Sequence, residues 1–185
     1  MRKTDNNKEY KKKLSILQNA KQYVAKDGWS KNLLNKLINN QIKSSDLSYF
    51  FPNGYMDLLE FSLNDLNKSL ENKISKINII NFPMSKRIKK ILTTRLEILN
   101  AEKDFYKKTF NHLTLPHNTK IMKRNLYKSI DNMWYLAGDN STDFSFYTKR
   151  LTLALIYTNA LFVFFNKDFE HAIINIDKNL KKISK

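Results

Sequence analysis

The stretch LTLALIYTNALFVFF, residues 151–165, is the most apolar part of the chain. A helix that spans a membrane needs about 20 consecutive apolar residues. This stretch has only 15 residues, and the polar side chains of Thr152, Thr158 and Asn159 interrupt it. We therefore predict a helix that is either buried on all sides or forms one wall of an apolar cavity.

The composition of the whole chain also favours helices. Its 185 residues are 42% hydrophobic and 12% aromatic, which is enough for a packed core. Gly and Pro number only three each, so the frequent sharp turns of a many-stranded β fold are scarce. We predict an all-α fold.

The formal net charge of the chain is +16, which suggests nucleic acid or an anionic membrane surface as a partner. Of the 33 basic residues, 28 are Lys and five are Arg, and Asn and Ile are abundant. This bias is typical of an AT-rich genome, so only part of the positive charge indicates function. The Arg residues are therefore the more informative basic positions.

The chain contains no Cys, which excludes disulfides, thiolate catalysis and Cys-based metal sites. The first residues, MRKTDNNKEYKKK, are basic but include no apolar segment, and Asp5 and Glu9 argue against a transit peptide. These features predict a cytoplasmic protein.

The N-terminal part of the chain is expected to form three helices that resemble a helix-turn-helix unit. The first covers about residues 9–26, the second is capped by Ser30, and the third covers residues 44–51. The sequence PNG at residues 52–54 then ends the unit. We predict a first domain over residues 1–54.

A helical bundle is expected over residues 55–166, with its helices broken at Pro83, Pro116 and Gly138. Within it, residues 73–95 carry seven basic side chains and no acidic one, which makes this segment the strongest local basic face.

The third predicted unit, residues 167–185, is an amphipathic, lysine-rich helix that starts near Asp168. Its apolar face includes Phe169, Ile173, Ile176 and Leu180.

The sequence contains no active-site pattern of a known type. His112, His117 and His171 do not have the spacing of metal ligands. The segment from Asp139 opens like a calcium loop, but Arg150 stands where that loop needs Glu. We therefore predict a binding protein that is not an enzyme and carries no cofactor or metal.

Carboxylate, aromatic and basic side chains share one face of the helix after Gly138. Asp143, Phe146, Tyr147 and Arg150 lie at helical spacing, and Ala154, Tyr157 and Leu161 continue the same face. Ser141 or Thr142 is expected to cap this helix.

Arg150 begins the long apolar stretch, where a charged group must reach solvent, form an ion pair or bind an anion. A phosphate head group would suit its guanidinium group, and an ion pair with an unidentified carboxylate is an equal alternative. The residues alone therefore predict an apolar cavity with an anion-binding edge.

Three segments of the chain are similar to the Coq-nine family of ubiquinone-biosynthesis proteins. They are MWYLAGDNSTDFSFYTKR at residues 133–150, LPHN at residues 115–118 and DGW at residues 27–29. The resemblance extends over about residues 14–183 in the same order. It implies a TetR-like fold with a buried apolar tunnel that binds isoprenoid lipids and phospholipid. Members of the family present quinone intermediates to the demethoxyubiquinone hydroxylase and are not themselves enzymes.

The resemblance also implies roles for individual residues of this chain. Residues 55–166 would form the lipid-binding bundle, and Arg150 would contact the phospholipid head group at the start of the lipid-binding face, with Tyr157 and Leu161 further along it. The amphipathic C-terminal helix would contact the membrane through Phe169, Ile173, Ile176 and Leu180. The surface that docks the hydroxylase would include Met133, Trp134, Asp143, Phe146 and Tyr147.

Phe146 stands where the family is expected to have Trp, so the aromatic face is kept and an N–H donor is lost. The C-terminal helix is also unusually rich in Lys for this role. Precursors of the family in eukaryotes carry a targeting extension, so the start of this chain predicts a bacterial, peripherally membrane-associated homologue.

A TetR-like, ligand-sensing transcription regulator is the alternative function. The helix that would read DNA, residues 44–51, contains Asp46 and no Lys, Arg, Asn or Gln. Recognition helices use such basic and amide side chains to contact phosphates and base edges. Sequence-specific binding of nucleic acid is therefore not expected. TetR-like folds often dimerise, so a homodimer is a further candidate assembly.

Overall fold

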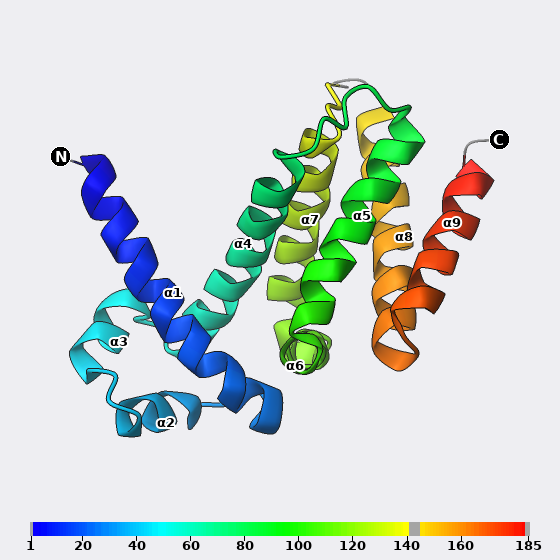
Figure 1. Ribbon diagram of the computed structural model, residues 1–185. Coiled ribbons are helices and arrows are strands. Elements are labelled where there is room, and N and C mark those ends of the chain that lie inside the picture. The colour runs from blue at the N-terminus through cyan, green and yellow to red at the C-terminus, as the bar shows by residue number, and fades with distance from the viewer. Residues whose placement is uncertain (1, 141–144, 184–185) are drawn as a thin grey trace. The chain divides into compact units, whose positions relative to one another are not determined.

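The computed structural model describes residues 2–140 and 145–183, and over these residues it contains nine α-helices, one short 3-10 helix and no strand (Figure 1). The predicted all-α fold is therefore confirmed. The elements are α1 (Arg2–Asp27), α2 (Leu33–Asn39), α3 (Ser44–Phe50), α4 (Tyr55–Ile74), α5 (Met84–Ala101), α6 (Lys103–Leu113), η1 (Pro116–Asn118), α7 (Thr119–Leu136), α8 (Ser145–Asn166) and α9 (Phe169–Ile183).

The chain forms two compact units. Unit 1 consists of Met1–Asn64 and Asp104–Asn118, and unit 2 consists of Asp65–Lys103 and Thr119–Lys185. The chain passes from one unit to the other within α4, at the start of α6 and just before α7. This division follows packing, whereas the predicted domains 1–54, 55–166 and 167–185 follow function and stay a prediction, as does the TetR-like arrangement.

Unit 1 begins with α1, which is longer than predicted and ends as predicted at Gly28. Gly28 has a φ of +81°, a left-handed conformation that glycine adopts without strain, and its N–H donates to the carbonyl of Val24 at 2.8 Å. The expected capping role of Ser30 is wrong, because Asn32 precedes α2 instead. The backbone carbonyl of Ser30 only accepts a hydrogen bond from the N–H of Leu33.

The core of unit 1 includes a buried polar contact between segments distant in sequence. The indole N–H of Trp29 donates to the hydroxyl of Thr109 on α6 at 2.9 Å, and the Trp29 ring lies 5.8 Å from the Phe105 ring. Because a buried indole N–H needs an acceptor, this hydrogen bond stabilises the packing of residues 27–29 on α6.

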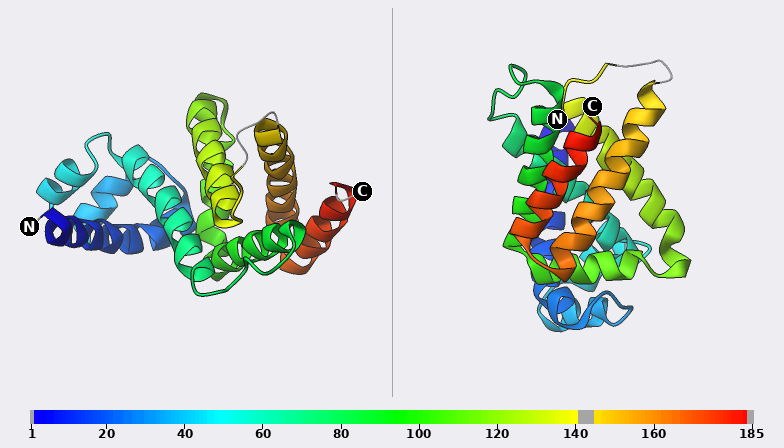
Figure 2. Two further views of the ribbon diagram at one scale, coloured as in Figure 1. Left: turned by 90° about the horizontal axis from the view of Figure 1, so that it is seen from above. Right: turned by 90° about the vertical axis from the view of Figure 1, so that its right-hand side faces the viewer.

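Unit 2 is built from α5, α7, α8 and α9 together with the second part of α4. Helix α9 packs most extensively on α8 and also contacts α5, while α7 packs on α5 and α8. Figure 2 shows α8 and α9 running side by side. The carboxylate of Asp168 caps α9 by accepting a hydrogen bond from the backbone N–H of His171 at 2.9 Å, and this bond lowers the pKa of Asp168.

Helix α8 is apolar around its whole circumference but buried on one face only. Leu153, Ile156, Ala160 and Phe164 are buried, whereas Leu151, Leu155 and Phe162 are each more than 60% exposed. The expectation of a helix buried on all sides is therefore wrong. The structure supports the other alternative, because α8 forms one wall of an apolar pocket.

Arg95 lies in the core of unit 2, with only 2% of its surface exposed. Its guanidinium group donates to the Tyr157 hydroxyl at 2.6 Å, the Asn67 carbonyl oxygen at 2.8 Å and the Ser129 hydroxyl at 2.9 Å. These four side chains, which we call the Arg95 cluster, come from α4, α5, α7 and α8. One arginine therefore links four helices of the unit.

Among the described residues, no helix combines the length and the apolar character that crossing a membrane requires.

Candidate functional site

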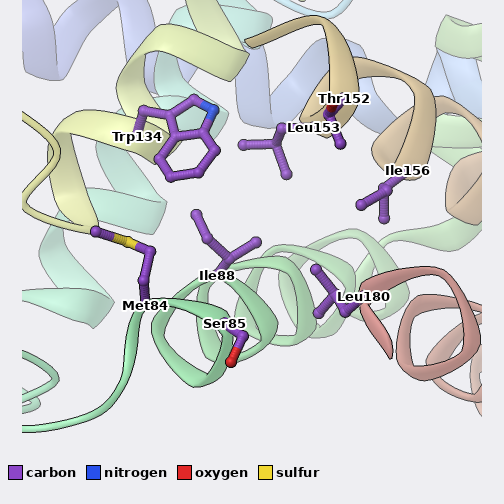
Figure 3. A pocket seen from close by; sticks show the side chains of 8 residues that line it. All are labelled: Met84, Ser85, Ile88, Trp134, Thr152, Leu153, Ile156 and Leu180. Atoms are coloured by element: carbon purple, nitrogen blue, oxygen red, sulfur yellow. The ribbon is translucent and has the colours of Figure 1, made fainter. Parts of the chain in front are cut away.

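An apolar pocket of about 180 Å³ lies in unit 2 between α5, α7, α8 and α9 (Figure 3). Its deeper part is formed by buried side chains, and its rim by side chains that reach solvent. The buried ones are Ile88, Trp134, Leu153 and Ile156, and the rim consists of Met84, Ser85, Thr152 and Leu180. Ile88 and Leu153 lie on the periodic apolar faces of their helices, so ordinary helical packing places them here.

Trp134 is the pocket residue with an unused polar atom. Its side chain is buried, and its indole N–H has no hydrogen-bond partner within the described part of the chain. Figure 3 shows the indole nitrogen on the edge of the ring that lies away from Met84 and Ile88. The ammonium of Lys149 lies 5.9 Å from the centre of the ring. The unpaired indole N–H is itself buried and therefore carries a desolvation cost in this arrangement.

Arg150 lies near this wall of the pocket, in contact with two carboxylates and one aromatic ring. Its Nε and Nη2 atoms donate to Asp131 at 2.9 and 2.8 Å, and Nη1 lies 3.5 Å from Asp139. The guanidinium carbon is 3.3 Å from the centre of the Phe146 ring. We call Arg150, Asp131, Asp139, Phe146 and Lys149 the Arg150 cluster.

Asp139 is the most buried carboxylate of the Arg150 cluster. Only 3% of its side chain is exposed, and it also accepts a hydrogen bond from Lys149 at 2.8 Å. Of the two alternatives for Arg150, the structure contains the ion pair and identifies its carboxylates as Asp131 and Asp139. Contact of Arg150 with a lipid head group stays a prediction.

The residues predicted to dock a partner have different environments. Tyr147 is 71% exposed on α8, and Phe146 is half-buried beneath Arg150. Met133 and Trp134 are buried, so they could influence a partner only through neighbouring side chains. Asp143 lies outside the described residues, as do the predicted capping residues Ser141 and Thr142.

The predicted lipid-binding residues of α8 lie beside the pocket rather than in its lining. Tyr157 is buried and bonded to Arg95, and Leu161 is buried further along the helix. The pocket instead uses Thr152, Leu153 and Ile156, which lie on the neighbouring side of α8. The spacing of seven residues between Arg150 and Tyr157 predicts that both lie on the face of α8 that meets α5 and α7. The pocket instead lies on the side of α8 toward α9.

The predicted membrane-contacting face of α9 packs within unit 2. Ile176 is fully buried, Phe169 and Ile173 are half-buried, and Leu180 lies at the pocket rim. Contact of these residues with a membrane stays a prediction.

The described residues include no cluster of three or more acidic or histidine side chains that could hold a metal ion. His112 and His117 lie close together in unit 1, with ring centres 6.4 Å apart. Burial of the His112 ring and the nearby His117 lower the pKa of His112 below the usual histidine value.

A family model and individual relatives both indicate similarity to the same family. Residues 120–185 match the COQ9 family model. The chain is 27% identical over 173 residues to a probable ubiquinone biosynthesis protein coq9, mitochondrial, from Dictyostelium discoideum, which covers 86% of the chain and 55% of that protein. The ubiquinone biosynthesis protein COQ9, mitochondrial, from Bos taurus is 29% identical over 165 residues, covering 84% of the chain and 52% of that protein. The human protein of the same name is 39% identical over 80 residues, covering 42% of the chain and 25% of that protein.

The chain is therefore similar to the COQ9 family model over residues 120–185 and to COQ9 proteins over most of its length. This confirms the resemblance to the Coq-nine proteins, and the chain spans about half the length of the first two relatives. The part that matches the COQ9 family model contains α7, α8 and α9. These helices supply three of the four walls of the pocket, and the matched residues include all of the Arg150 cluster, so the COQ9 match covers most of the candidate site.

Proposed function

We propose that the chain is a non-catalytic, lipid-binding accessory protein of ubiquinone biosynthesis. It binds isoprenoid quinone intermediates and phospholipid at a membrane surface and presents the intermediates to the demethoxyubiquinone hydroxylase. The observation that carries this proposal is the apolar pocket in a chain that is similar to COQ9 proteins, which are named for this pathway.

The size of the pocket supports a quinone ring or a short part of an isoprenoid tail as the bound group. An apolar cavity of roughly 150 Å³ holds a benzene ring, and this pocket has about 180 Å³. Each 100 Å² of tail that leaves water contributes about 2.5 kcal/mol at the usual 25 cal/mol per Å². A long isoprenoid tail would extend beyond the rim at Met84 and Leu180.

The indole N–H of Trp134 lies buried beside the pocket with no partner in the described part of the chain, and less than 1 Å² of its nitrogen is exposed, so a shift of the ring would be needed to present it to a ligand. A quinone carbonyl is an acceptor of the kind that this donor lacks, whereas a hydrocarbon tail offers none. We expect Trp134→Phe, which keeps the aromatic ring, to weaken retention of a quinone more than retention of an isoprenoid hydrocarbon. Mass spectrometry of lipids bound after incubation with each ligand measures this difference, and equal losses would contradict the role of the N–H.

Arg150 is the proposed contact for a phospholipid head group. Its ion pair with Asp131 is partly open to solvent, and both of its N–H groups donate to one carboxylate oxygen, so a phosphate oxygen could replace that acceptor. We expect Arg150→Ala to weaken phospholipid retention more than it lowers stability. Arg124→Ala, an exposed arginine on α7, serves as the matched control. Collapse of the fold in Arg150→Ala would instead support a purely structural ion pair.

Presentation to the hydroxylase rests on the exposed part of the predicted docking surface. Tyr147 is exposed in the first turn of α8, next to Phe146 of the Arg150 cluster. Exposed aromatic side chains are enriched at protein interfaces. We expect Tyr147→Ala to weaken binding of the purified hydroxylase while lipid retention stays unchanged.

Membrane contact through α9 remains part of the proposal. Its amphipathic pattern and its Lys residues suit an anionic surface, but Ile176 can reach lipid only if α9 leaves α5 and α8. Removal of the residues after Asn166 is expected to reduce flotation with liposomes. Unchanged flotation would contradict this assignment.

Organic extraction of the purified chain, followed by mass spectrometry, is the central test. We expect isoprenoid quinone and phospholipid to be recovered, and we expect the protein alone to leave quinone intermediates chemically unchanged. Absence of both lipids, with no uptake when they are offered, would contradict the proposal. Turnover of an intermediate by the purified protein would contradict its non-catalytic character.

A TetR-like transcription regulator is the alternative function. Helix α3 exposes Ser45, Ser48 and Tyr49 and offers no basic side chain to DNA, which disfavours it. Tight, sequence-selective binding of duplex DNA at physiological salt in a gel-shift assay would favour the regulator over the lipid-binding protein.

A further inference from the structure

The loop between α4 and α5, residues 75–83, exposes apolar side chains in an alternating pattern that continues into α5. Ile79 is buried, whereas Ile80, Phe82 and Met84 are 54%, 43% and 36% exposed. The buried residue anchors the loop to unit 2, and the three exposed residues form a small apolar tip. Exposed apolar groups of this size carry a hydration cost that contact with an apolar phase would remove.

Arg87 fixes the shape of this loop. Its Nε atom donates to the carbonyl of Phe82 at 2.7 Å, Nη1 donates to the carbonyl of Ala137 at 2.9 Å, and Nη2 donates to the carbonyl of Ile80. Three backbone acceptors are thus bound by one guanidinium group. The exposure of Ile80 and Phe82 is therefore set by an ordered loop and not by a loose chain.

The turn at Gly138 packs directly against the same loop. Gly138 has a φ of +79°, and a Cβ atom there would lie 3.3 Å from Nη1 of Arg87 and 3.4 Å from Cδ1 of Ile80. The absence of a side chain at this position lets the α7–α8 turn support the loop closely.

The surroundings of the apolar tip are positively charged. Lys73, Lys76 and Lys86 are exposed on either side of it. No Asp or Glu occurs between Glu71 and Glu97 in the sequence. Basic side chains around a small apolar tip are complementary to a bilayer that contains anionic lipids, because the lysines meet phosphates while the apolar groups enter the interface.

The tip also leads directly to the mouth of the pocket. Met84 belongs to both, and Ser85 follows it on the pocket rim. Figure 1 shows the loop crossing the end of unit 2 at which α8 begins and α9 ends. A bilayer in contact with the tip would therefore meet the pocket rim without any rearrangement of α9.

We propose that residues 75–84 are a membrane-docking tip that inserts Ile80, Phe82 and Met84 into the interface of an anionic bilayer. Lys73, Lys76 and Lys86 bind lipid phosphates, and the pocket mouth faces the membrane. This inference deepens the proposed lipid-binding function by naming the surface that meets the membrane, and that surface is distinct from the predicted face of α9.

The exposed apolar stripe of α8 provides an internal contrast. Leu151, Leu155 and Phe162 are more exposed than the tip, but residues 151–166 contain no charged side chain. The electrostatic attraction that brings a protein to an anionic surface is therefore present at the tip and absent along this stripe. The two surfaces supply matched variants for the test.

Single tryptophans placed in the two surfaces report contact with lipid directly. Phe82→Trp and Phe162→Trp change one exposed phenylalanine each, while the native Trp29 and Trp134 are buried and give the baseline. The probe is a vesicle of phosphatidylcholine and phosphatidylglycerol with brominated acyl chains. We expect quenching of the added tryptophan in Phe82→Trp only. Quenching in Phe162→Trp alone, or in neither variant, would overturn the proposal.

Flotation with the same vesicles, without bromine, measures the contribution of the tip to binding. The double variant Ile80→Asn with Phe82→Ser is compared with Ile174→Asn with Phe162→Ser. The second variant alters one residue of α9 that is about as exposed as Ile80 and one residue of α8 that is more exposed than Phe82. We expect the first to lose roughly tenfold or more in partitioning and the second to change little. Equal losses in both would overturn the proposal.

The charge contribution is tested with Lys73→Gln and Lys86→Gln together, against Lys123→Gln and Lys128→Gln on the exposed face of α7. Each lysine of the tip should contribute about fivefold on anionic vesicles and nothing on pure phosphatidylcholine. If the α7 variant loses as much binding to anionic vesicles, only the total charge of the protein determines binding, and the proposed role of the tip is overturned.

These experiments separate the tip from the proposed function. If lipids are extracted with the protein and the protein floats with vesicles, but the tip variants bind normally, the tip is overturned while lipid binding stands. If the tip is quenched by brominated lipid but no lipid is ever extracted or taken up, the tip stands and the proposed pocket function fails.

Discussion

Arg95 and Arg150 are both arginines of unit 2 that are shielded from solvent, but their partners differ. Arg95 is 2% exposed and donates to neutral oxygen atoms of Asn67, Ser129 and Tyr157. Arg150 has a 13% exposed side chain and pairs with the carboxylates of Asp131 and Asp139. One cation is held by neutral hydrogen-bond acceptors from several helices, and the other by charge compensation near the pocket wall.

This difference separates the structural role of Arg95 from the binding role that we propose for Arg150. The Arg95 cluster cannot exchange partners without opening the core, because its acceptors are on α4, α7 and α8. The Arg150 cluster includes Asp131, which is about half exposed and can be replaced by a competing anion. We therefore expect the two arginines to respond differently to substitution and to salt.

Arg95→Met should have the largest effect. It removes three charge-assisted hydrogen bonds and leaves the Tyr157 hydroxyl buried without its donor, so we expect a loss of about 3 kcal/mol in the free energy of unfolding. Urea denaturation followed by circular dichroism measures this loss. Arg95→Lys, which keeps the charge but not the three-way geometry, should recover only part of it. A stabilised Arg95→Met protein would mean that the desolvation of the guanidinium outweighs its hydrogen bonds.

Arg150→Ala should have a smaller effect that depends on salt. We expect a loss of about 1–2 kcal/mol at low ionic strength, because Asp139 keeps its bond to Lys149 and Asp131 is partly hydrated. In about 0.5 M NaCl, the loss in the free energy of unfolding caused by Arg150→Ala should be smaller, because salt screens partly exposed ion pairs. The loss caused by Arg95→Met should not change with salt. Equal salt sensitivity of the two variants would remove the distinction between the clusters.

Tyr157→Phe tests one acceptor of the Arg95 cluster without changing the ring. We expect a loss of about 1 kcal/mol in the free energy of unfolding, because Nε of Arg95 loses its acceptor while the ring stays 5.2 Å from the guanidinium carbon. Tyr147→Phe, on the exposed side of α8, should stay within about 0.5 kcal/mol of the unchanged protein. Chemical denaturation of both variants in parallel measures the two losses in the free energy of unfolding. Equal losses would contradict the role of the Tyr157 hydroxyl.

His112 in unit 1 extends the comparison to a half-buried histidine with an unpaired ring nitrogen. Its Nε2 atom has no hydrogen-bond partner in the described part of the chain, and its pKa is lowered by burial and by His117. The neutral form is thus favoured by folding. The resulting stability is complete above the ordinary pKa of about 6.5 and declines as the pH falls below that value.

We expect acidification from about pH 7.5 to 5.5 to lower the melting temperature slightly, with the smallest effect of the four. His112→Phe should reduce that pH dependence. Identical pH profiles for the unchanged protein and His112→Phe would contradict the role assigned to His112.

Local sequence patterns predicted the helices well because their signals lie within a few residues. Pro83 immediately precedes α5, Gly28 and Gly138 follow α1 and α7 with positive φ, and Asp168 caps α9. Ser30 failed as a cap because the chain continues through a turn before α2. A turn of this kind depends on packing that a single side chain does not encode.

The partners of the arginines could not be predicted in the same way. Asp131 lies 19 residues before Arg150 on another helix, so only the tertiary arrangement brings them together. Arg95 was counted in the basic face of residues 73–95, yet it lies seven residues after the buried Ile88 on the same face of α5. That periodicity was a usable signal for a buried arginine. The periodicity of α5 does not predict that Arg95 contacts Asn67 and Ser129, because these residues lie on other helices.

Gly138 limits how this part of the molecule can vary. A side chain there would need both an unfavourable backbone conformation and a displacement of Arg87 or Ile80. The turn before α8 and the loop before α5 therefore have to change together in any engineered or natural variant. A grafting experiment that transfers residues 75–84 to another helical scaffold would consequently have to transfer the glycine turn as well, because the arginine that orders the loop takes one of its acceptors from that turn.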